Sequence, residues 1–396
     1  MIESWRWYGD LDTISLSEIR QTGANGIVTA LHEIPYGVVW ERDAISKRRD
    51  IIRAAKLDWL VCESLPISED IKRGSGDLSG LFANYRQSMS NLAVEGVKTI
   101  CYNFMPILDW TRTDLTAPVA AGGTCLRFCT TKMAAFEIYM LERKDAEADY
   151  DQEVLKKAAA WYAASDQYDQ KLLLNSIMSG LPGAYDRYDI AGLKDALDSY
   201  QGIIQSDIRA NYKRFLDEII PTAEDLGVRL CVHPDDPPRD ILGLPRIVSN
   251  AQDIDWIISA CDSPANGLTL CTGSLGAGPK NDIIEIARTH SGKIHFAHLR
   301  NVRKDLDGSF EEAAHLEGDT DMVKVCQILL QEEQSRCSKG RSDWNIPFRP
   351  DHGHAILSDV DRKFFPGYPL VGRLRGLSEL RGIVHALSNS LVHDPK

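Results

Sequence analysis

Eight short apolar segments, separated by stretches with helical periodicity, limit the folds open to this chain. The segments are 4–9, 26–34, 58–67, 98–107, 228–234, 267–273, 293–300 and 345–353. Most are apolar throughout rather than alternating, as in strands buried on both faces of a parallel sheet. Helical patterns that often end on glycine lie between them, at 15–23, 43–56, 85–96 and 214–227. A strand followed by a helix, repeated eight times, predicts an α/β fold of the (β/α)8 TIM barrel type, with a doubly wound sheet as the alternative.

The connection between the fourth and fifth apolar segments is far longer than the others. It runs from about residue 114 to 212, with an expected loop at 123–132 and charged helical patterns over 133–178. No linker rich in Pro, Gly or Ser brackets it, so we predict a helical insertion in one domain, 1–396, rather than a separate domain. Such an insertion can cover a site or form an oligomer contact. We expect a homo-oligomer.

Charge and cysteine content narrow the class of partner. With 45 Lys and Arg against 57 Asp and Glu the net charge is −12, which disfavours binding to nucleic acid or to an anionic membrane. We see no basic, apolar leader and no uninterrupted apolar run of about 18 residues. The nine cysteines contain no Cys-x-x-Cys pair and are typical of reduced thiols. We therefore expect a cytoplasmic protein that acts on a small molecule.

Four of the apolar segments end on residue types that bind divalent metals. These are His233, Cys271, His298 and Asp351. The carboxyl ends of barrel strands meet at one face, where functional groups of this fold gather, so the four side chains predict one metal site. Taken singly, each histidine could equally be packed at the barrel rim, and the cysteine could be a small buried hydrophobe.

Further polar residues follow the same strand ends. Asp235 and Asp236 could bind substrate hydroxyls, orient a ligating histidine, or face water in a turn. His352 is the candidate for proton transfer beside Asp351, because imidazole titrates near neutral pH. His32 and Arg300 lie at strand ends and are candidates for binding substrate, and Glu63 is a weaker one.

Other histidines and the glycine clusters have simpler interpretations. His290 and His295 are expected to be structural, and His354 to face solvent. The glycines of 273–278 do not have the spacing of a dinucleotide fingerprint, which disfavours hydride transfer. The cluster at 74–80 lacks the Gly-Lys-Ser/Thr ending of a phosphate loop.

A series of motifs resembles the mannonate dehydratases of the hexuronate pathway. In chain order they are RWYG, VTALHEIP, ESLPISEDIK, CYNFMPILDWTRTDL, HPDDPP, GLPRIVS, NGLTLCTGSLG, FAHLRNV, FEEAAHLEGD, RPDHGH, PGYPLVGRLRGL and ELRG. The resemblance extends from Arg6 to about Ala386 and is weakest over 125–215.

This resemblance implies a barrel similar to xylose isomerase and metal-dependent dehydration of D-mannonate to 2-keto-3-deoxy-D-gluconate. It also implies the same four metal ligands, catalytic roles for His352 and Tyr368, and Mn²⁺ as the cofactor, with Fe²⁺ as the alternative. Tyr368 suits the role of acid unless a neighbouring cation helps it to ionise. Two other functions stay open: a metal-dependent sugar isomerase, and a sugar-acid binding protein without catalysis.

Overall fold

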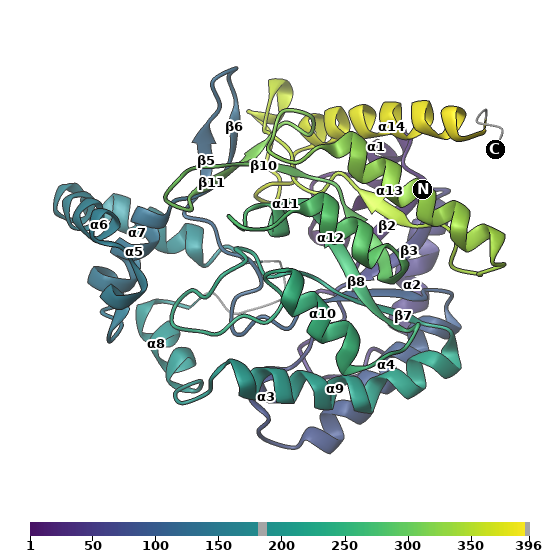
Figure 1. Ribbon diagram of the computed structural model, residues 1–396, viewed down its shortest axis with the longest axis horizontal. Coiled ribbons are helices and arrows are strands. Elements are labelled where there is room, and N and C mark those ends of the chain that lie inside the picture. Colours follow the sequence, from purple (N-terminus) through teal and green to yellow (C-terminus); the bar gives the residue numbers. More distant parts are fainter. Residues whose placement is uncertain (181–187, 393–396) are drawn as a thin grey trace.

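The computed structural model describes residues 1–180 and 188–392 and contains a closed barrel of eight parallel strands (Figure 1). The order around the barrel is β1-β12-β9-β8-β7-β4-β3-β2. The strands are β1 Ile2–Arg6, β2 Gly26–Thr29, β3 Asp58–Glu63, β4 Thr99–Tyr102, β7 Arg229–Val232, β8 Asn266–Cys271, β9 Ile294–His298 and β12 Pro347–Arg349. Each coincides with one of the predicted apolar segments. The predicted (β/α)8 barrel is confirmed.

Helices cover the outside of the barrel, and their bounds are α1 Leu16–Gln21, α2 Arg42–Ala54, α3 Glu69–Arg73, α4 Leu78–Val94, α9 Gln205–Leu226, α10 Ala251–Ala260, α11 Thr272–Gly276, α12 Ile283–His290, α13 Met322–Ser338 and α14 Leu370–Val392. The four helical patterns predicted from sequence correspond to α1, α2, α4 and α9. Helix α9 ends at Gly227, whose φ of 65° is the left-handed value that glycine adopts without strain.

The long connection between β4 and β7 contains both strands and helices. Its helices are α5 Thr130–Ala135, α6 Gln152–Ala164, α7 Gln167–Ile177 and α8 Ile190–Asp198. Helices α5 to α7 project to one side of the barrel in Figure 1. The expected loop at 123–132 is wrong, because β5 (Asp114–Pro118) and β6 (Thr124–Phe128) form a hairpin there.

This hairpin joins a second sheet that the sequence did not predict. The sheet has the order β10-β11-β6-β5, with β10 at Asn301–Lys304 and β11 at Phe310–Ala313. Strands β10 and β11 follow β9 directly, so the sheet stands beside the carboxyl ends of the barrel strands. Whether a segment as short as β11 forms a strand depends on the strand that it pairs with. Its partner β6 lies far away in the sequence.

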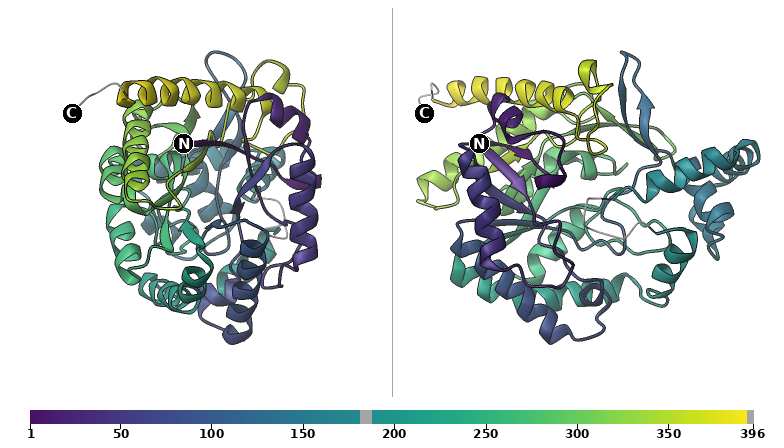
Figure 2. Two further views of the ribbon diagram at one scale, coloured as in Figure 1. Left: turned by 90° about the vertical axis from the view of Figure 1, so that its right-hand side faces the viewer. Right: turned by 180° about the vertical axis from the view of Figure 1, so that it is seen from behind.

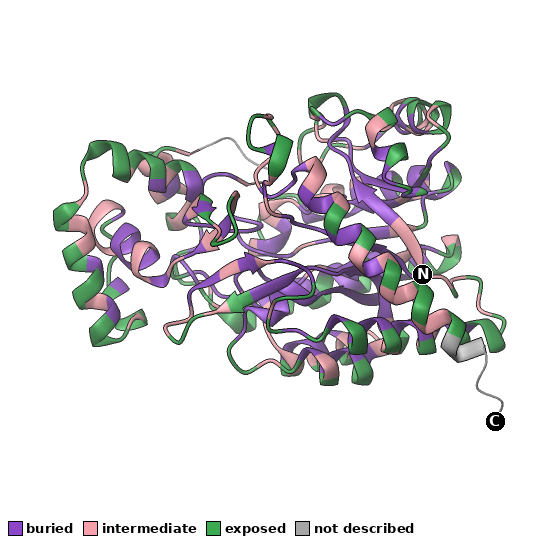
Figure 3. Ribbon diagram, turned by 90° about the horizontal axis from the view of Figure 1, so that it is seen from above, coloured by how far each residue is buried: buried purple, intermediate pink, exposed green. Residues whose placement is uncertain are grey.

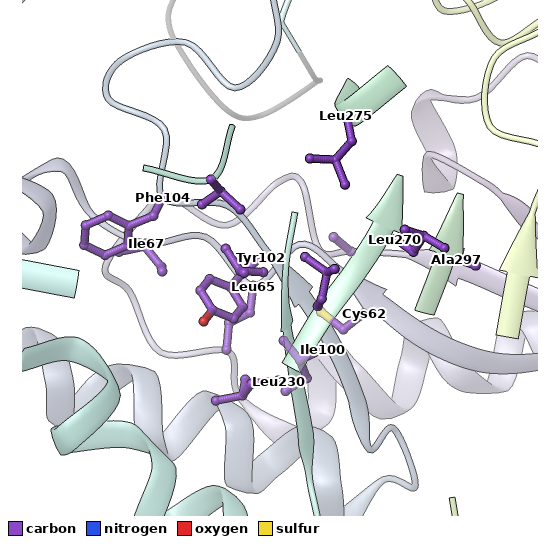
Figure 4. Close-up of a cluster of buried hydrophobic side chains, with 14 of the residues drawn as sticks. Cys62, Leu65, Ile67, Ile100, Tyr102, Phe104, Leu230, Leu270, Leu275 and Ala297 are labelled. Carbon is purple, nitrogen blue, oxygen red and sulfur yellow. The ribbon is translucent and has the colours of Figure 1, made fainter. Parts of the chain in front are cut away.

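Alternate residues of the barrel strands face inward and outward. The inward side chains include a small buried apolar cluster of Val28, Val61, Cys101, Cys231 and Phe296. On the outward side, Ile100, Leu230 and Leu270 pack toward the helices (Figure 4). Figure 3 shows the same division at the scale of the molecule, with buried strands inside and exposed faces on the helices. The apolar cluster fills the inside of the barrel, so a functional site is expected beyond it, at the carboxyl ends of the strands.

Strand β1 and helix α14 lie on the same side of the molecule (Figure 2). Helix α14 is joined to the first strand by a salt bridge between Arg381 and Glu3, and Arg373 Nη1 donates to the carbonyl of Arg6 over 3.0 Å. Within the described residues, none of the helices combines the length and the apolar character needed to cross a bilayer.

Candidate active site

The four predicted metal ligands lie at the carboxyl ends of four adjacent strands. Cys271 and His298 are the last residues of β8 and β9, His233 follows β7, and Asp351 lies just beyond β12. These strands are consecutive around the barrel. Because side chains alternate along a strand, His233 points inward like Cys231, two residues earlier.

Together these side chains form a compact cluster of donor atoms. His233 Nε2 lies 3.1 Å from His298 Nδ1, and the donor atoms of His233, Cys271 and His298 are all within 4.8 Å of one another. Asp351 Oδ2 is 3.8 Å from His298 Nδ1 and 3.9 Å from Cys271 Sγ. Distances of this size leave room for one small cation between the four side chains.

The remaining ring nitrogen of each imidazole faces an acceptor. His233 Nδ1 donates to the carbonyl of Pro234 over 2.7 Å, and His298 Nε2 lies 3.4 Å from Glu63 Oε2. The hydrogen bond to Pro234 fixes the tautomer of His233, whereas the approach of His298 Nε2 to Glu63 lacks hydrogen-bond geometry. The arrangement therefore suits His233 Nε2 and His298 Nδ1 as ligand atoms.

Asp351 presents one oxygen to the cluster and keeps the other engaged. Oδ1 accepts a hydrogen bond from Tyr368 over 3.3 Å and forms an ion pair with Arg349, while Oδ2 faces the two donors named above. Burial would raise the pKa of this carboxyl, but Arg349, His352 and other cations hold it well below its ordinary value. Asp351 also has a φ of 60°, a left-handed conformation that is uncommon outside glycine.

Cys271 is held as a thiolate by its surroundings. Its sulfur accepts hydrogen bonds from the hydroxyl of Ser274 over 3.1 Å and from the Ser274 backbone N–H over 3.4 Å. Burial raises the pKa of the thiol, but the charge of Arg300 and hydrogen bonds from His233 and His298 lower it well below the ordinary value. Two imidazoles, a thiolate and a carboxylate are a donor set that fits a transition-metal dication.

The pKa of His233 depends on its neighbour Cys271. Desolvation lowers this pKa, but the hydrogen bond and charge of Cys271 raise it to about 10. Metal ligands must be deprotonated, so binding of a cation here would release a proton from His233.

A second group of donors, Glu63, Cys101 and His298, also lies within 4.8 Å. Arg349 Nη2 is 2.7 Å from Glu63 Oε1, and Arg6 Nη1 is 3.5 Å from Glu63 Oε2. Two guanidinium groups pair with Asp351 as well, so charge pairing does not separate the two groups. Burial raises the pKa of the Cys101 thiol well above its ordinary value, whereas Cys271 is held as a thiolate, so the first cluster is the better cation site.

The cavity beside the cluster contains both predicted catalytic residues. It is lined by Glu63, Ser64, Cys101, Tyr102, Asn103, Met105, Asp109, Trp110, His233, Asp236, Arg300, Arg349, Asp351, His352 and Tyr368. The ring centroids of His352 and Tyr368 are 5.0 Å apart and the rings are nearly perpendicular. Burial raises the pKa of Tyr368 to about 12, even though Arg349 opposes the shift. A phenol in this state is a proton donor at neutral pH.

His352 is held by a buried network of charges. Its Nδ1 lies 3.0 Å from Glu312 Oε1 and 2.6 Å from Arg300 Nη1. Glu312 Oε1 also accepts from Arg112 over 3.0 Å. Desolvation opposes ionisation of Glu312, yet Arg300 and His352 lower the pKa of this carboxyl to about 2.

The predicted substrate-binding residues are only partly brought together. Arg300 and Asp236 line the cavity, and Arg300 Nη2 lies 2.5 Å from Asp236 Oδ2. Asp235 is not among the lining residues, since its carboxylate accepts from Val248 N–H over 2.7 Å in the neighbouring loop. His32 is also outside the lining, with its Nε2 3.4 Å from Arg6 Nη2.

The other histidines lie away from the donor cluster. His290 Nε2 is 3.4 Å from Asp255 on the outer helices, and His295 is buried in a strand, where burial lowers its pKa to about 3. His354 was expected to face solvent, but it is half-buried and its Nε2 donates to the carbonyl of Glu312 over 2.8 Å.

Sequence reasoning missed several charged residues of the site. Arg349 is the last residue of β12 and pairs in register with His298 of β9, so strand alternation could have identified it. Glu63 is the last residue of β3, and its position at a strand end made it a weak candidate in the sequence. It lines the cavity and pairs with Arg349. Glu312 and Arg112 had no such position, because they come from outside the barrel strands.

Comparisons with known proteins agree in pointing to one family. The family model described as D-mannonate dehydratase (UxuA) matches residues 1–393. A mannonate dehydratase of Chromohalobacter salexigens is 49% identical over 388 residues, covering 98% of this chain and 99% of the relative. One from Marinomonas sp. is 48% identical over 392 residues, covering 99% and 100%.

Solved structures give the same picture. The crystal structure of mannonate dehydratase from Streptococcus suis serotype2 has a TM-score of 0.78 at 32% identity and covers 100% of this chain and 96% of that one. A D-tagatose 3-epimerase-like protein has a TM-score of 0.52 at 10% identity, covering 99% and 100%, which shows a shared barrel fold alone.

Proposed function

Because the chain belongs to the D-mannonate dehydratase (UxuA) family, it is a metal-dependent hydro-lyase that dehydrates D-mannonate to 2-keto-3-deoxy-D-gluconate, and we propose which residues perform this reaction. His233, Cys271, His298 and Asp351 hold the divalent cation. The observation that carries this assignment is the 3.1 Å approach of two imidazole nitrogens beside a thiolate, with both outer ring nitrogens facing acceptors.

We propose Mn²⁺ as the cation, with Fe²⁺ as the alternative. The carboxylate of Asp351 admits Mn²⁺, whereas the thiolate of Cys271 and the two imidazoles also suit Fe²⁺. Stripping the purified protein with a chelator and adding back single metals tests the choice. Activity restored by Mn²⁺ or Fe²⁺ supports it, and activity with Mg²⁺ alone contradicts it.

Elimination of water from D-mannonate requires loss of a proton at C2 and of hydroxide at C3. The C2 proton is barely acidic beside a charged carboxylate, and a bound dication supplies the Lewis-acid chemistry that neutralises this charge. The chain must supply a base for C2 and an acid for the C3 hydroxyl.

His352 and Tyr368 are the pair that we assign to these steps. The Tyr368 hydroxyl already acts as a donor, to Asp351, so it can give its proton to the leaving C3 hydroxyl. His352 takes the C2 proton at Nε2 in the tautomer that donates its Nδ1 hydrogen to Glu312, and this donation competes with the Arg300 N–H group for the same nitrogen. The enol product then becomes the 2-keto acid by gaining a proton at C3.

Arg300 and Asp236 form the polar wall of the cavity and are assigned to binding the sugar acid. Asp236 accepts from Arg112 Nη1 over 2.7 Å as well as from Arg300, so its carboxylate is fixed. His32 and Asp235 stay weaker proposals for substrate binding, because neither lines the cavity.

Incubation with D-mannonate tests the assignment. Wild-type protein should form a 2-keto-3-deoxy acid, detected by a colour reagent, and His352→Ala should bind metal but form no product. Turnover of an aldose without reaction of mannonate would favour a sugar isomerase. Unchanged product formation in the His352→Ala variant would remove it from the chemistry.

Three properties of the whole protein are also proposals. We propose one domain with an insertion at about 114–212 and a homo-oligomer, since Tyr168 and Leu172 of α7 are 72% and 51% exposed. We propose a cytoplasmic location because all nine cysteines are free thiols. Light scattering of the purified protein tests the assembly.

A further inference from the structure

The backbone at Asp351 is constrained on the side that precedes it. Its φ of 60° sets the orientation of the peptide group between Pro350 and Asp351 relative to the Asp351 side chain. Only a residue whose surroundings fix that peptide group will keep such a conformation. The carbonyl of Pro350 belongs to this peptide group, so whatever binds the carbonyl also fixes where the Asp351 carboxylate points.

His315 binds this carbonyl. It lies in the segment between β11 and α13, 35 residues from Pro350 in sequence, and its Nε2 donates to the Pro350 oxygen over 2.7 Å. The side chain is 3% exposed. Nε2 carries a hydrogen, since it faces a carbonyl oxygen, which can only accept. Burial lowers the pKa of His315 and so disfavours the charged imidazole.

Helix α14 holds the ring of His315 in place. A Cβ at Gly376 would lie 2.1 Å from His315 Cε1 and 2.5 Å from its Nε2, so the imidazole occupies the space that any other residue would fill. The same helix approaches the 350–354 segment closely, because a Cβ at Gly372 would lie 1.8 Å from the carbonyl oxygen of His354. Because these two glycines have no side chain, α14 can pack closely against His315 and against the 350–354 segment that carries Asp351.

We propose that His315, seated on Gly376, is a positioning residue for the metal site that sets the direction of the Asp351 carboxylate through the Pro350 carbonyl. This proposal rests on the proposed ligand set. His315 touches neither the substrate cavity nor the donor cluster, and its effect passes through one backbone peptide group. A loss of the contact should weaken metal binding and leave the barrel folded.

Calorimetric titration of Mn²⁺ into the chelator-stripped, full-length protein tests the proposal. His315→Leu removes the donor, and Gly376→Ala displaces the ring from the opposite side. Each should weaken Mn²⁺ binding by about 10- to 100-fold, the usual effect of losing an outer partner of a metal ligand. His315→Gln, which keeps an N–H donor, should recover part of the affinity, and the double variant should bind no more weakly than the poorer single one.

Gly382→Ala is the matched control. It lies on the same helix, nothing lies within 4 Å of the point that a Cβ would occupy there, and it should keep the wild-type affinity for Mn²⁺. Circular dichroism of each metal-free variant checks that it is folded. If His315→Leu does not fold, the Mn²⁺ affinity of Gly376→Ala tests the proposal. Wild-type affinity in folded His315→Leu or Gly376→Ala would overturn the proposal.

Asp351→Asn separates this proposal from the ligand set on which it rests. If Asp351→Asn weakens Mn²⁺ binding but His315→Leu does not, the positioning role alone is wrong. If neither affects binding, the ligand set is wrong as well.

Discussion

His233 Nε2 lies 3.1 Å from His298 Nδ1, although the two strands that carry these residues do not pair with each other. Strand β8 runs between β7 and β9 and ends on Cys271, which places its thiolate beside both imidazoles. The central strand of the three therefore supplies the softest donor of the cluster.

Replacing this thiolate should reduce metal binding. Cys271→Ser exchanges a thiolate for a neutral hydroxyl, which is a poor ligand for Mn²⁺ or Fe²⁺, and we expect at least about tenfold weaker binding. Metal analysis of the purified variant after dialysis measures the effect. Cys326→Ser, at a buried cysteine of α13, is the control and should keep its metal. Full metal occupancy of Cys271→Ser would argue against the proposed ligand set.

Tyr368→Phe should reduce turnover and leave metal content unchanged. The substitution removes only the hydroxyl that donates to Asp351 Oδ1, while Arg349 still pairs with the same oxygen. Loss of a general acid lowers turnover by about 10²- to 10⁴-fold. Steady-state kinetics with D-mannonate, together with metal analysis, separates the two effects. Tyr139→Phe, at a ring stacked on Tyr162 in the insertion, should behave as wild type. Equal activity of Tyr368→Phe would remove this residue from the chemistry.

The barrel was predictable because its strands carry the signal in their own residues. Runs such as 228–234 and 293–300 are apolar throughout, and each ends on a polar residue where the strand leaves the core. The same pattern located His233 and His298. Strand alternation also holds for Arg349, the last residue of β12, which pairs in register with His298.

The second sheet and its contribution to the site were not predictable in this way. Glu312 reaches His352 because β11 pairs with β6, a contact between segments that are nearly two hundred residues apart. Nothing in the local sequence of FEEAAHLEGD distinguishes Glu312, which is buried, from Glu311, which forms a salt bridge with Arg127 nearer the surface. Pairing partners of this kind are set by tertiary structure.

Glu312→Gln should slow catalysis without loss of metal. The carboxylate holds His352 Nδ1 over 3.0 Å, and an amide at this position can present its NH₂ group instead of an acceptor. Misplacement of a catalytic group costs about 100-fold in rate, and we expect a loss of turnover of this order. KM should rise as well, because Glu312 also pairs with Arg300 of the substrate cavity over 2.9 Å. Kinetics with D-mannonate measures it. Glu311→Gln on the same strand is the control, and an equal effect in both variants would show that His352 does not depend on Glu312.

Glu312 should also contribute to acid unfolding. Its pKa is lowered from 4.5 to about 2 in the folded chain, mainly by Arg300 and His352 acting against desolvation. A carboxylate with a depressed folded pKa stabilises the protein above its unfolded pKa, and this contribution is lost as the pH falls through the folded pKa. The free energy of unfolding should therefore decline between about pH 4.5 and pH 2.

Glu312→Gln should be less stable than wild type at neutral pH, because Arg112 and Arg300 lose a buried anion. The two proteins should become equally stable near pH 2, where the protonated carboxyl resembles the amide. Urea unfolding of the chelator-stripped proteins at a series of pH values measures both curves, and a difference that stays constant down to pH 2 would contradict the lowered pKa of Glu312.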